Sequence, residues 1–353
     1  MSIMLIMLVR ELGEFKLIET LAQAITDDNA LCIERLNKQG FRLLLPIGDD
    51  AAAWNGPSGT QILTTDTLVE GTHFNLDQIS WRSLGWKSLA VNLSDVAAMG
   101  CKPLYFLVTL GLREDLPVEG LLEMYRGMLE LSVRCGGAII GGDIVRSPVF
   151  FVTVTLQGTS SVTSKGFNSP QSVILTRDTC SPGDKIAVTG YLGCSGGGLQ
   201  MLTQGLKLDT ETERHLLQAH NRPEPRVAQG IILAQRGVTS CIDISDGLVD
   251  DLWKLSKSSG VGAMINANLV PVDEFLKQAY PQNWLNLALC GGEDYELLFT
   301  APSDVMDRVI SKLNVVTSVL GEIVEGPPQV KVLDPDGNEL HIANGGWDHF
   351  QPH

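Results

Sequence analysis

Acidic residues beside glycine and small polar residues are the groups in this sequence best suited to chemistry. The stretch TSCIDISDGLVDD (239–251) places Asp243 and Asp246 just after an apolar run, with Asp250 and Asp251 one helical turn further on. Four carboxylates so close together repel one another, and burying an unpaired carboxylate is costly. The pattern therefore predicts a positively charged partner.

Five other acidic motifs repeat this combination along the chain. They are GDD (48–50), TTD (64–66), NLSD (92–95), GGD (141–143) and GGED (291–294). A single motif of this kind usually forms a turn or a helix N-cap. Six such motifs are harder to explain in that way, because the chain has only 26 Lys and Arg against 41 Asp and Glu.

Magnesium is the simplest partner for these carboxylates. It binds carboxylate, hydroxyl and water oxygens, and it is usually held by a few carboxylates together with substrate phosphates. Thr64 and Thr65 beside Asp66, and Ser245 within the ISD motif, supply neutral oxygens for such a site. Several magnesium ions imply a polyphosphate ligand, and the sequence therefore predicts ATP.

The familiar nucleotide-binding motifs are missing from the chain. It has no G-x-x-x-x-G-K-[ST] motif, and GYLGCSGGGL (190–199) has the wrong glycine spacing for a dinucleotide fingerprint. This segment follows a strand and opens a helix, so its backbone N–H groups could meet a phosphate. Glycine-rich turns of this kind are more often structural, and both interpretations stay open.

The net charge and the cysteines indicate which partners and which cellular compartment to expect. A formal charge of -15 argues against nucleic-acid or membrane partners. The seven cysteines are dispersed without zinc spacing, which favours reduced thiols in a cytoplasmic protein. The apolar N-terminus MSIMLIMLVR lacks a basic n-region and a cleavage site, so we expect a ragged extension or an added strand.

The elements that must position the acidic motifs follow from hydrophobic periodicity and from glycine and proline breaks. The pattern predicts helices over 13–26, 81–99 and 117–134, and strands over 61–66, 103–112, 136–143, 149–159 and 185–190. A segment rich in Ser, Gly and Pro at 160–172 is typical of a linker. We therefore expect two domains, residues 1–159 and 160–353, each with α/β or α+β architecture.

Nine motifs, in order, resemble those of the thiamine-monophosphate kinases, within the superfamily of aminoimidazole ribonucleotide synthetase, selenophosphate synthetase and the hydrogenase-maturation dehydratase. The motifs are GEFKLIE, IGDDAA, TTDTLVEGTHF, KSLAVNLSDVAAMG, GGDIVRSP, RPEPR, IDISDGLVDDL, GGEDYELLFT and GGWDHF. The resemblance implies two mixed α/β domains of the aminoimidazole ribonucleotide synthetase type with a cleft between them, and a homodimer formed by the first domains.

The resemblance also implies roles for residues whose motifs match. The magnesium ligands would be Asp50, Thr64, Thr65, Asp66, Asp95, Asp143, Asp243 and Asp246. ATP would be contacted by Tyr125, Gly142, Asp143, Arg177 and Ser245. Thiamine monophosphate would be contacted by His73, Glu293 and Trp347. The chain departs from the usual family pattern at Ala51, at Ile144 and in the length of 160–172.

Alternative roles stay open for several of these residues. His73 could be a satisfied, partly buried histidine, Glu293 a helix cap, and Trp347 part of the core. An aromatic face at Trp347 would also suit a cationic thiazolium ring. Arg226 is expected to be structural or ion-paired, and Cys241 to belong to the core.

The implied reaction transfers a phosphoryl group from ATP to thiamine monophosphate, giving thiamine diphosphate and ADP. A phosphate monoester has a second pKa of about 6, so the acceptor is largely a dianion near pH 7. Such a nucleophile needs no general base, and we expect direct in-line transfer in which magnesium screens the repulsion between phosphates. Two alternatives are a selenophosphate synthetase-like enzyme and a non-catalytic sensor of nucleotides or thiamine phosphates.

Overall fold

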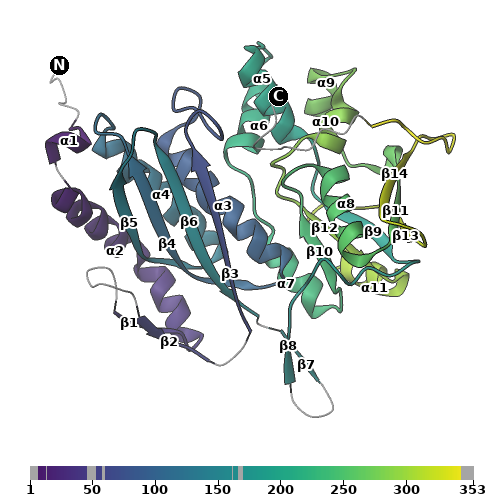
Figure 1. The fold of residues 1–353 in the computed structure, drawn as a ribbon, viewed down its shortest axis with the longest axis horizontal. Coiled ribbons are helices and arrows are strands. Elements are labelled where there is room, and N and C mark those ends of the chain that lie inside the picture. Colours follow the sequence, from purple (N-terminus) through teal and green to yellow (C-terminus); the bar gives the residue numbers. More distant parts are fainter. Residues whose placement is uncertain are drawn as a thin grey trace. The chain divides into compact units, whose positions relative to one another are not determined.

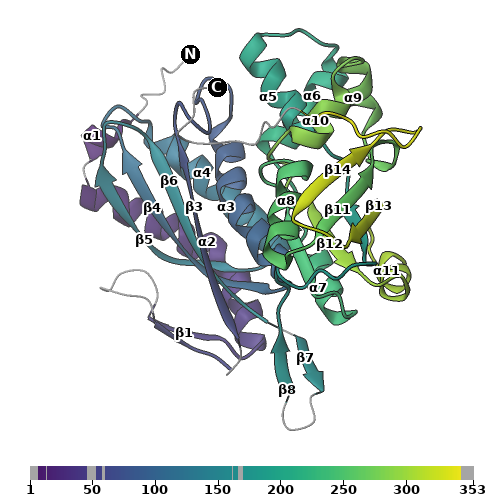
Figure 2. The same cartoon turned by 45° about the vertical axis from the view of Figure 1, so that its right-hand side comes forward.

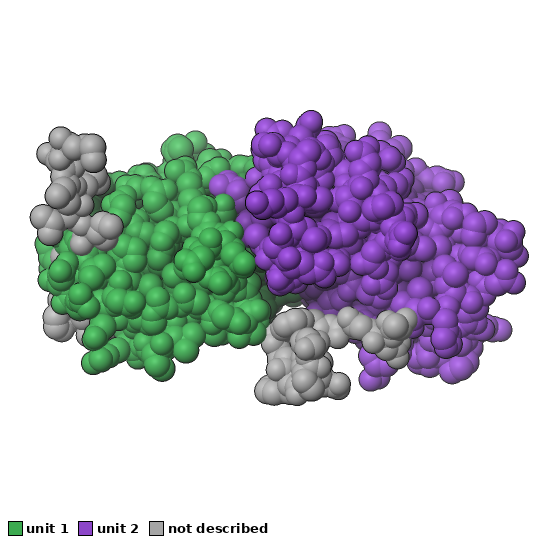
Figure 3. All heavy atoms as spheres, turned by 90° about the horizontal axis from the view of Figure 1, so that it is seen from above, with its two compact units in different colours: residues 1–96, 102–160 green, residues 97–101, 161–353 purple. Residues whose placement is uncertain are grey.

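The structure is a computed structural model that describes residues 7–12, 14–45, 53–57, 60–160, 162–165 and 170–342. The chain forms two compact units, which Figure 3 colours separately. Unit 1 comprises Met1–Val96 and Lys102–Ser160, and unit 2 comprises Ala97–Cys101 and Ser161–His353. The assignment of Ala97–Cys101 to unit 2 has no counterpart in the pattern of the sequence.

Unit 1 is built on a four-stranded mixed sheet in the order β3-β6-β4-β5 (Figure 1). Strands β4 and β5 are parallel, and the other neighbours are antiparallel. Helices α2, α3 and α4 lie on one face of this sheet (Figures 1 and 2). In chain order the elements are α1 (Val9–Leu12), α2 (Glu14–Lys38), β1 (Arg42–Leu45), β2 (Ala53–Asn55), β3 (Gln61–Val69), α3 (Trp81–Ala98), β4 (Lys102–Leu112), α4 (Val118–Cys135), β5 (Ala138–Arg146) and β6 (Phe151–Thr159).

The core of unit 1 follows from the period-two alternation of its strands. In β6, Val152, Val154 and Leu156 are fully buried on the helix-covered face. The other face is only partly exposed among the described residues, since the outward side chains of β6 are of intermediate exposure. Leu63 of β3 is 73% exposed and Leu107 of β4 is 41% exposed.

Unit 2 contains a six-stranded sheet in the order β10-β12-β9-β13-β11-β14. Only β11 and β14 are parallel neighbours, and the other adjacent pairs are antiparallel. Its elements are β7 (Val162–Lys165), β8 (Pro170–Val173), β9 (Lys185–Thr189), α5 (Cys194–Gln204), α6 (Thr210–Asn221), α7 (Val227–Gln235), β10 (Ser240–Asp243), α8 (Leu248–Ser259), β11 (Gly262–Asn266), η1 (Ala267–Leu269), α9 (Glu274–Ala279), α10 (Trp284–Cys290), β12 (Leu297–Ala301), α11 (Ser303–Ile310), β13 (Thr317–Val324) and β14 (Gln329–Leu333).

Two predicted segments differ from the structure. The first helix extends to Lys38, well beyond residue 26. The expected linker instead contains an antiparallel pair, β7 and β8. This pairing is made by backbone hydrogen bonds, which a composition rich in Ser and Gly does not reveal. Among the described residues, no helix is both long enough and apolar enough to cross a membrane.

Candidate functional site

Three oxygen-bearing side chains gather on the helix-covered side of the sheet in unit 1. The Thr64 hydroxyl on β3 donates a hydrogen bond to the Asp95 carboxylate on α3. Asp66 follows Thr64 by two residues and shares its face of β3. Burial, and then the negative charge of Asp95, raise the pKa of Asp66 from 3.8 to about 6. A cation beside these carboxylates would relieve their mutual repulsion.

Two carboxylates and a hydroxyl fit magnesium, because Mg²⁺ is usually held by one or two carboxylates together with water and substrate phosphates. Within the described parts of the chain, no three His, Cys, Asp or Glu side chains come together as a metal cage. The arrangement in unit 1 therefore suits an ion that arrives with a phosphate ligand better than a structural metal.

The other predicted ligands of unit 1 occupy separate places. Thr65 lies on the opposite face of β3, where its hydroxyl is 3.1 Å from the Thr155 hydroxyl. Asp143 is exposed on β5, and its carboxylate accepts a 2.9 Å hydrogen bond from the N–H of Ile144. Strands β3 and β5 are the two edges of the sheet, so the described unit does not bring Asp143 to Asp66.

Three further predicted residues of unit 1 have clear structural surroundings. His73 lies in the turn after β3, and its Nδ1 accepts a hydrogen bond of 3.1 Å from the N–H of Val69. Tyr125 on α4 is only 5% exposed, and burial raises the pKa of its phenol. Gly142 approaches β4 closely, since a Cβ there would lie 2.0 Å from the Val108 carbonyl oxygen.

In unit 2, three loops meet at one end of the strands of the six-stranded sheet. Strand β10 ends at Asp243, which pairs with Leu297 at the beginning of the antiparallel strand β12. Strand β9 ends at Thr189, next to Val188, the partner of Leu298 on β12. The segments 190–193, 244–247 and 291–296 therefore leave the sheet side by side.

The acidic run 243–251 is held together by its own groups. Asp251 is fully buried, and its Oδ2 accepts hydrogen bonds of 3.0, 3.0 and 3.1 Å from the N–H groups of Ser245, Asp246 and Gly247. The ammonium group of Lys254 lies 2.7 Å from Asp251 Oδ1 and also forms an ion pair with Asp246. Burial raises the pKa of Asp251, and the charge of Lys254 opposes that shift.

The sequence argument expected a positively charged partner for this run, and Lys254 is such a partner for Asp246 and Asp251. The three backbone N–H groups add further hydrogen bonds to Asp251. Lys254 follows Asp251 by three residues on α8, a spacing at which helical side chains meet, so the sequence did contain its signal. Asp243 is buried, with 3% of its surface exposed.

The GGEDYE segment packs directly against this loop through the backbone. The N–H of Glu293 donates to the Ser245 carbonyl at 2.8 Å, and the N–H of Tyr295 donates to the Ile244 carbonyl at 2.8 Å. A Cβ on Gly292 would lie 2.6 Å from the Ser245 carbonyl oxygen, so this approach requires glycine. Glu293 and Tyr295 have φ values of 65° and 52°, a left-handed conformation that is unfavourable for both residue types.

The acid that follows Glu293 occupies the N-terminus of α5. Asp294 accepts hydrogen bonds from the N–H groups of Gly193 at 2.7 Å and Ser195 at 3.4 Å. Burial raises the pKa of Asp294 well above its ordinary value, against the effect of these two hydrogen bonds. The glycine-rich turn at 190–199 therefore uses these N–H groups to bind a carboxylate of its own chain, which supports a structural role.

Glu293 is held by a buried histidine. His220 Nδ1 lies 3.4 Å from Glu293 Oε2 and 3.2 Å from Ser195 Oγ. A serine nucleophile needs the base and the orienting acid on different ring nitrogens. Because both contacts here involve the same nitrogen, the arrangement positions Glu293 and does not activate Ser195. Glu293 precedes the strand β12, which argues against the alternative role of a helix cap.

An ion pair anchors the end of the same segment. Arg226 of the RPEPR motif binds both carboxylate oxygens of Glu296, which also accepts a 2.6 Å hydrogen bond from Thr189. Glu296 is 6% exposed, so this carboxylate is almost wholly removed from water. The expectation that Arg226 is ion-paired is confirmed. Cys241 is 2% exposed, which confirms its place in the core.

Arg177 stands apart from the Ser245 loop. The neighbouring Thr176 bridges to Ser240, at the beginning of β10, whereas Ser245 follows the end of that strand. Asp50 and Trp347, and the departure at Ala51, lie outside the described residues. Sequence reasoning missed Lys254, although its spacing from Asp251 on α8 was a signal. It also missed His220 and the contact of Asp294 with the N-terminus of α5, because both depend on which segments pack together.

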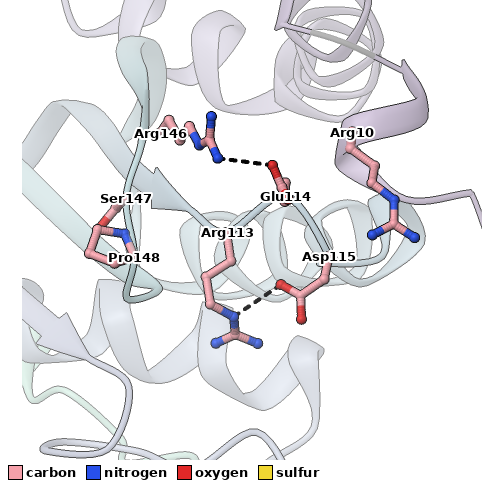
Figure 4. A pocket seen from close by; sticks show the side chains of 7 residues that line it. All are labelled: Arg10, Arg113, Glu114, Asp115, Arg146, Ser147 and Pro148. Carbon is pink, nitrogen blue, oxygen red and sulfur yellow. Dashed lines mark hydrogen bonds and ion pairs between the residues drawn. The ribbon is translucent and has the colours of Figure 1, made fainter.

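A surface pocket of about 550 Å³ lies elsewhere in unit 1 (Figure 4). Three arginines contribute to its lining, but two of them are already engaged. Arg113 pairs with Asp115 at 3.1 Å, and Arg146 pairs with Glu114 at 3.1 Å. In Figure 4 the guanidinium group of Arg146 is directed toward Glu114, and those of Arg113 and Arg10 lie on either side of Asp115, so the three groups do not converge on one point. None of the residues predicted for the site lines this pocket.

Comparison with known proteins shows which protein families this chain is similar to. Residues 48–160 match the family model of the AIR synthase related protein, N-terminal domain, and residues 181–333 match its C-terminal domain. The thiamine-monophosphate kinase of Escherichia coli (strain K12) is 35% identical over 347 residues, covering 96% of this chain and 98% of the relative.

Two solved structures extend the comparison. The thiamine-monophosphate kinase from Stenotrophomonas maltophilia K279a has a TM-score of 0.77 and 31% identity, covering 90% of this chain and 97% of that one. A structure of AaThiL complexed with AMPPCP and TMP has a TM-score of 0.72 and 30% identity, covering 99% of this chain and all of that one. The likeness spans both units and includes the segments that carry the carboxylates.

Proposed function

We propose, from the premise that the chain belongs to the thiamine-monophosphate kinase family, that it phosphorylates thiamine monophosphate with ATP to give thiamine diphosphate. The observation that carries this proposal is the similarity to kinases over nearly the full length of the chain. The carboxylate pair of unit 1 adds a physical reason, since a site for polyphosphates must neutralise negative charge.

The mechanism we propose is direct in-line transfer. The phosphate of thiamine monophosphate is largely a dianion near pH 7, so it can attack the γ-phosphorus of ATP without a general base. Magnesium, when bound, would neutralise charge on the transferred group and reduce the repulsion between the two substrates. In this scheme the residues of the chain chiefly bind and orient, and no phosphoenzyme forms.

The ligand set we propose combines acids from several motifs. Metal ions would be held by Asp50, Thr64, Thr65, Asp66, Asp95, Asp143, Asp243 and Asp246. Nucleotide contacts would come from Tyr125, Gly142, Asp143, Arg177 and Ser245, and contacts to thiamine monophosphate from His73, Glu293 and Trp347. The hydrogen bond from Thr64 to Asp95 supports the first set, because it fixes the orientation of one carboxylate.

In the proposal, neighbouring side chains hold the loops that carry two of these residues. Asp251 gathers three N–H groups and so fixes the loop that carries Asp246. The ion pair between Arg226 and Glu296 holds the segment that carries Glu293. Because these loops are already held in place before the substrates bind, less conformational entropy is lost when the reactive geometry forms.

We also propose a cytoplasmic homodimer that forms through unit 1. The exposed sheet face supports this assembly, since Leu63 and Leu107 present apolar side chains there. The seven free cysteines support a reducing compartment. Replacing Leu63 with Glu should convert the dimer to a monomer in size-exclusion chromatography with light scattering. A Leu63→Glu protein that stays dimeric would exclude this face.

The decisive experiment is a coupled ADP-release assay with thiamine monophosphate, with and without magnesium. ADP should appear only when all three components are present, and a chelator should stop it. Selenide in place of thiamine monophosphate tests the selenophosphate synthetase alternative, and binding without ADP release would indicate a sensor. An Asp246→Ala protein should remain folded and inactive, and wild-type turnover in that variant would remove Asp246 from the site.

A further inference from the structure

Lys254 is the nearest cation to the predicted metal ligand Asp246 among the described contacts. It lies near the end of the second turn of α8, and its side chain reaches back toward the loop that precedes the helix. The ammonium group pairs with Asp246 Oδ2 and lies 2.7 Å from Asp251 Oδ1. The side chains of Lys254 and Asp246 are 32% and 34% exposed, so water screens this pair only in part.

Asp251 holds the ammonium group of Lys254 in place beside the loop at 245–247. One of its carboxylate oxygens accepts the three N–H groups of residues 245–247, and the other oxygen binds Lys254. Because Asp251 is fully buried and cannot turn away, it anchors the ammonium group beside Asp246. The charge of Lys254 is therefore aimed at Asp246 by a partner that stays in place.

We propose that Lys254 is a resident counter-cation that competes with a divalent metal ion for Asp246 and so raises the metal concentration that the enzyme requires. The proposal rests on the proposed function, in which Asp246 is a metal ligand. A carboxylate oxygen that binds an ammonium group is not available to a metal in the same geometry. An anchored positive charge next to the site also repels the ion.

The competition distinguishes Lys254 from a residue that simply binds phosphate. A phosphate-binding lysine would strengthen the binding of metal and nucleotide together, so its removal would weaken both. A competing lysine has the opposite effect on the metal, because its removal leaves Asp246 with an unbalanced negative charge. The direction of the change in metal affinity therefore separates the two roles.

The test measures Mn²⁺ binding to the full chain by electron paramagnetic resonance, in the presence of a non-hydrolysable ATP analogue. Lys254→Met should lower the dissociation constant of the Asp246-dependent Mn²⁺ roughly three- to tenfold, the effect of removing one unit charge near a partly exposed site. Lys254→Arg keeps the charge and should leave the constant unchanged. Lys257→Met is the matched control, since Lys257 lies one turn further along α8, over the ring of Trp253.

Asp246→Asn identifies the ion concerned and tests the premise separately. If this variant binds as much Mn²⁺ as the wild type, Asp246 is no ligand and the premise fails. If it loses one class of Mn²⁺ but Lys254→Met leaves that class unchanged or weaker, the premise stands and the competition is overturned. Lys254→Gln retains a donor for Asp251 and should shift affinity in the same direction as Lys254→Met, whichever of the two variants folds better.

Discussion

Replacing Asp66 with Asn should make the metal-free protein more stable while abolishing its activity. The pKa of Asp66 is raised from 3.8 to about 6 by burial and by the charge of Asp95, so the ionised carboxylate is unfavourable in the folded state. A shift of about two units corresponds to about 3 kcal/mol at 1.36 kcal/mol per unit. Because the side chain is only half-buried, water screens part of this energy, and we expect about 1–2 kcal/mol.

The pH dependence of this difference has a definite sign. Below pH 3.8 Asp66 is protonated in both folded and unfolded chains, and its contribution to stability is fully present. Between pH 3.8 and about 6 the unfolded chain loses its proton first, so the free energy of unfolding decreases as the pH rises. Asn carries no such charge, so the advantage of Asp66→Asn should grow across this window and stay constant above it.

Urea unfolding in the presence of a chelator, at pH 4 and at pH 7.5, measures this effect. Asp77→Asn is the matched control, because Asp77 lies exposed in a turn of the same unit, and it should change stability by less than about 0.5 kcal/mol. Magnesium with ATP should stabilise the wild type more than Asp66→Asn. An Asp66→Asn protein that is less stable than the wild type at pH 7.5 without metal would refute the reasoning.

Three other predictions concern unit 2. Arg226→Met leaves the buried Glu296 without its partner and should lower the free energy of unfolding by about 3–5 kcal/mol in urea titrations. Gly292→Ala places a Cβ 2.6 Å from the Ser245 carbonyl oxygen, and the resulting shift should cost about 1–3 kcal/mol and reduce the rate of ADP release. Glu293→Gln keeps the shape but removes the charge, so KM for thiamine monophosphate should rise more than KM for ATP in steady-state kinetics.

Arg226→Met has a matched control, and each of the three predictions has an outcome that would contradict it. Arg308→Met removes an exposed helical ion pair with Asp304 and should cost less than about 1 kcal/mol. A similar loss in both arginine variants would show that burial of Glu296 contributes little. Full ADP release by Gly292→Ala would mean that the two loops can separate without harm. Equal changes in both KM values for Glu293→Gln would argue against a contact with thiamine monophosphate.

Much of the fold follows from local patterns in the sequence. The helix predicted at 81–99 is α3, Trp81–Ala98, and the strand predicted at 149–159 contains β6, Phe151–Thr159. Periodicity succeeds here because burial of one face repeats every two residues in a strand and every three or four in a helix. It fails at 160–172, where β7 and β8 are held by backbone hydrogen bonds that do not depend on side-chain type.

For the candidate site, too, some features follow from the sequence and others only from the tertiary structure. The sequence by itself determined that acids cluster beside glycine and hydroxyl residues, and that so many carboxylates need positive partners. Only the tertiary structure decided which partner each acid has, giving Asp95 a hydroxyl from Thr64, Asp246 the charge of Lys254, and Glu293 the ring of His220. The physical reason is range: hydrogen bonds and ion pairs act over a few ångströms, and packing alone sets which distant segments come that close.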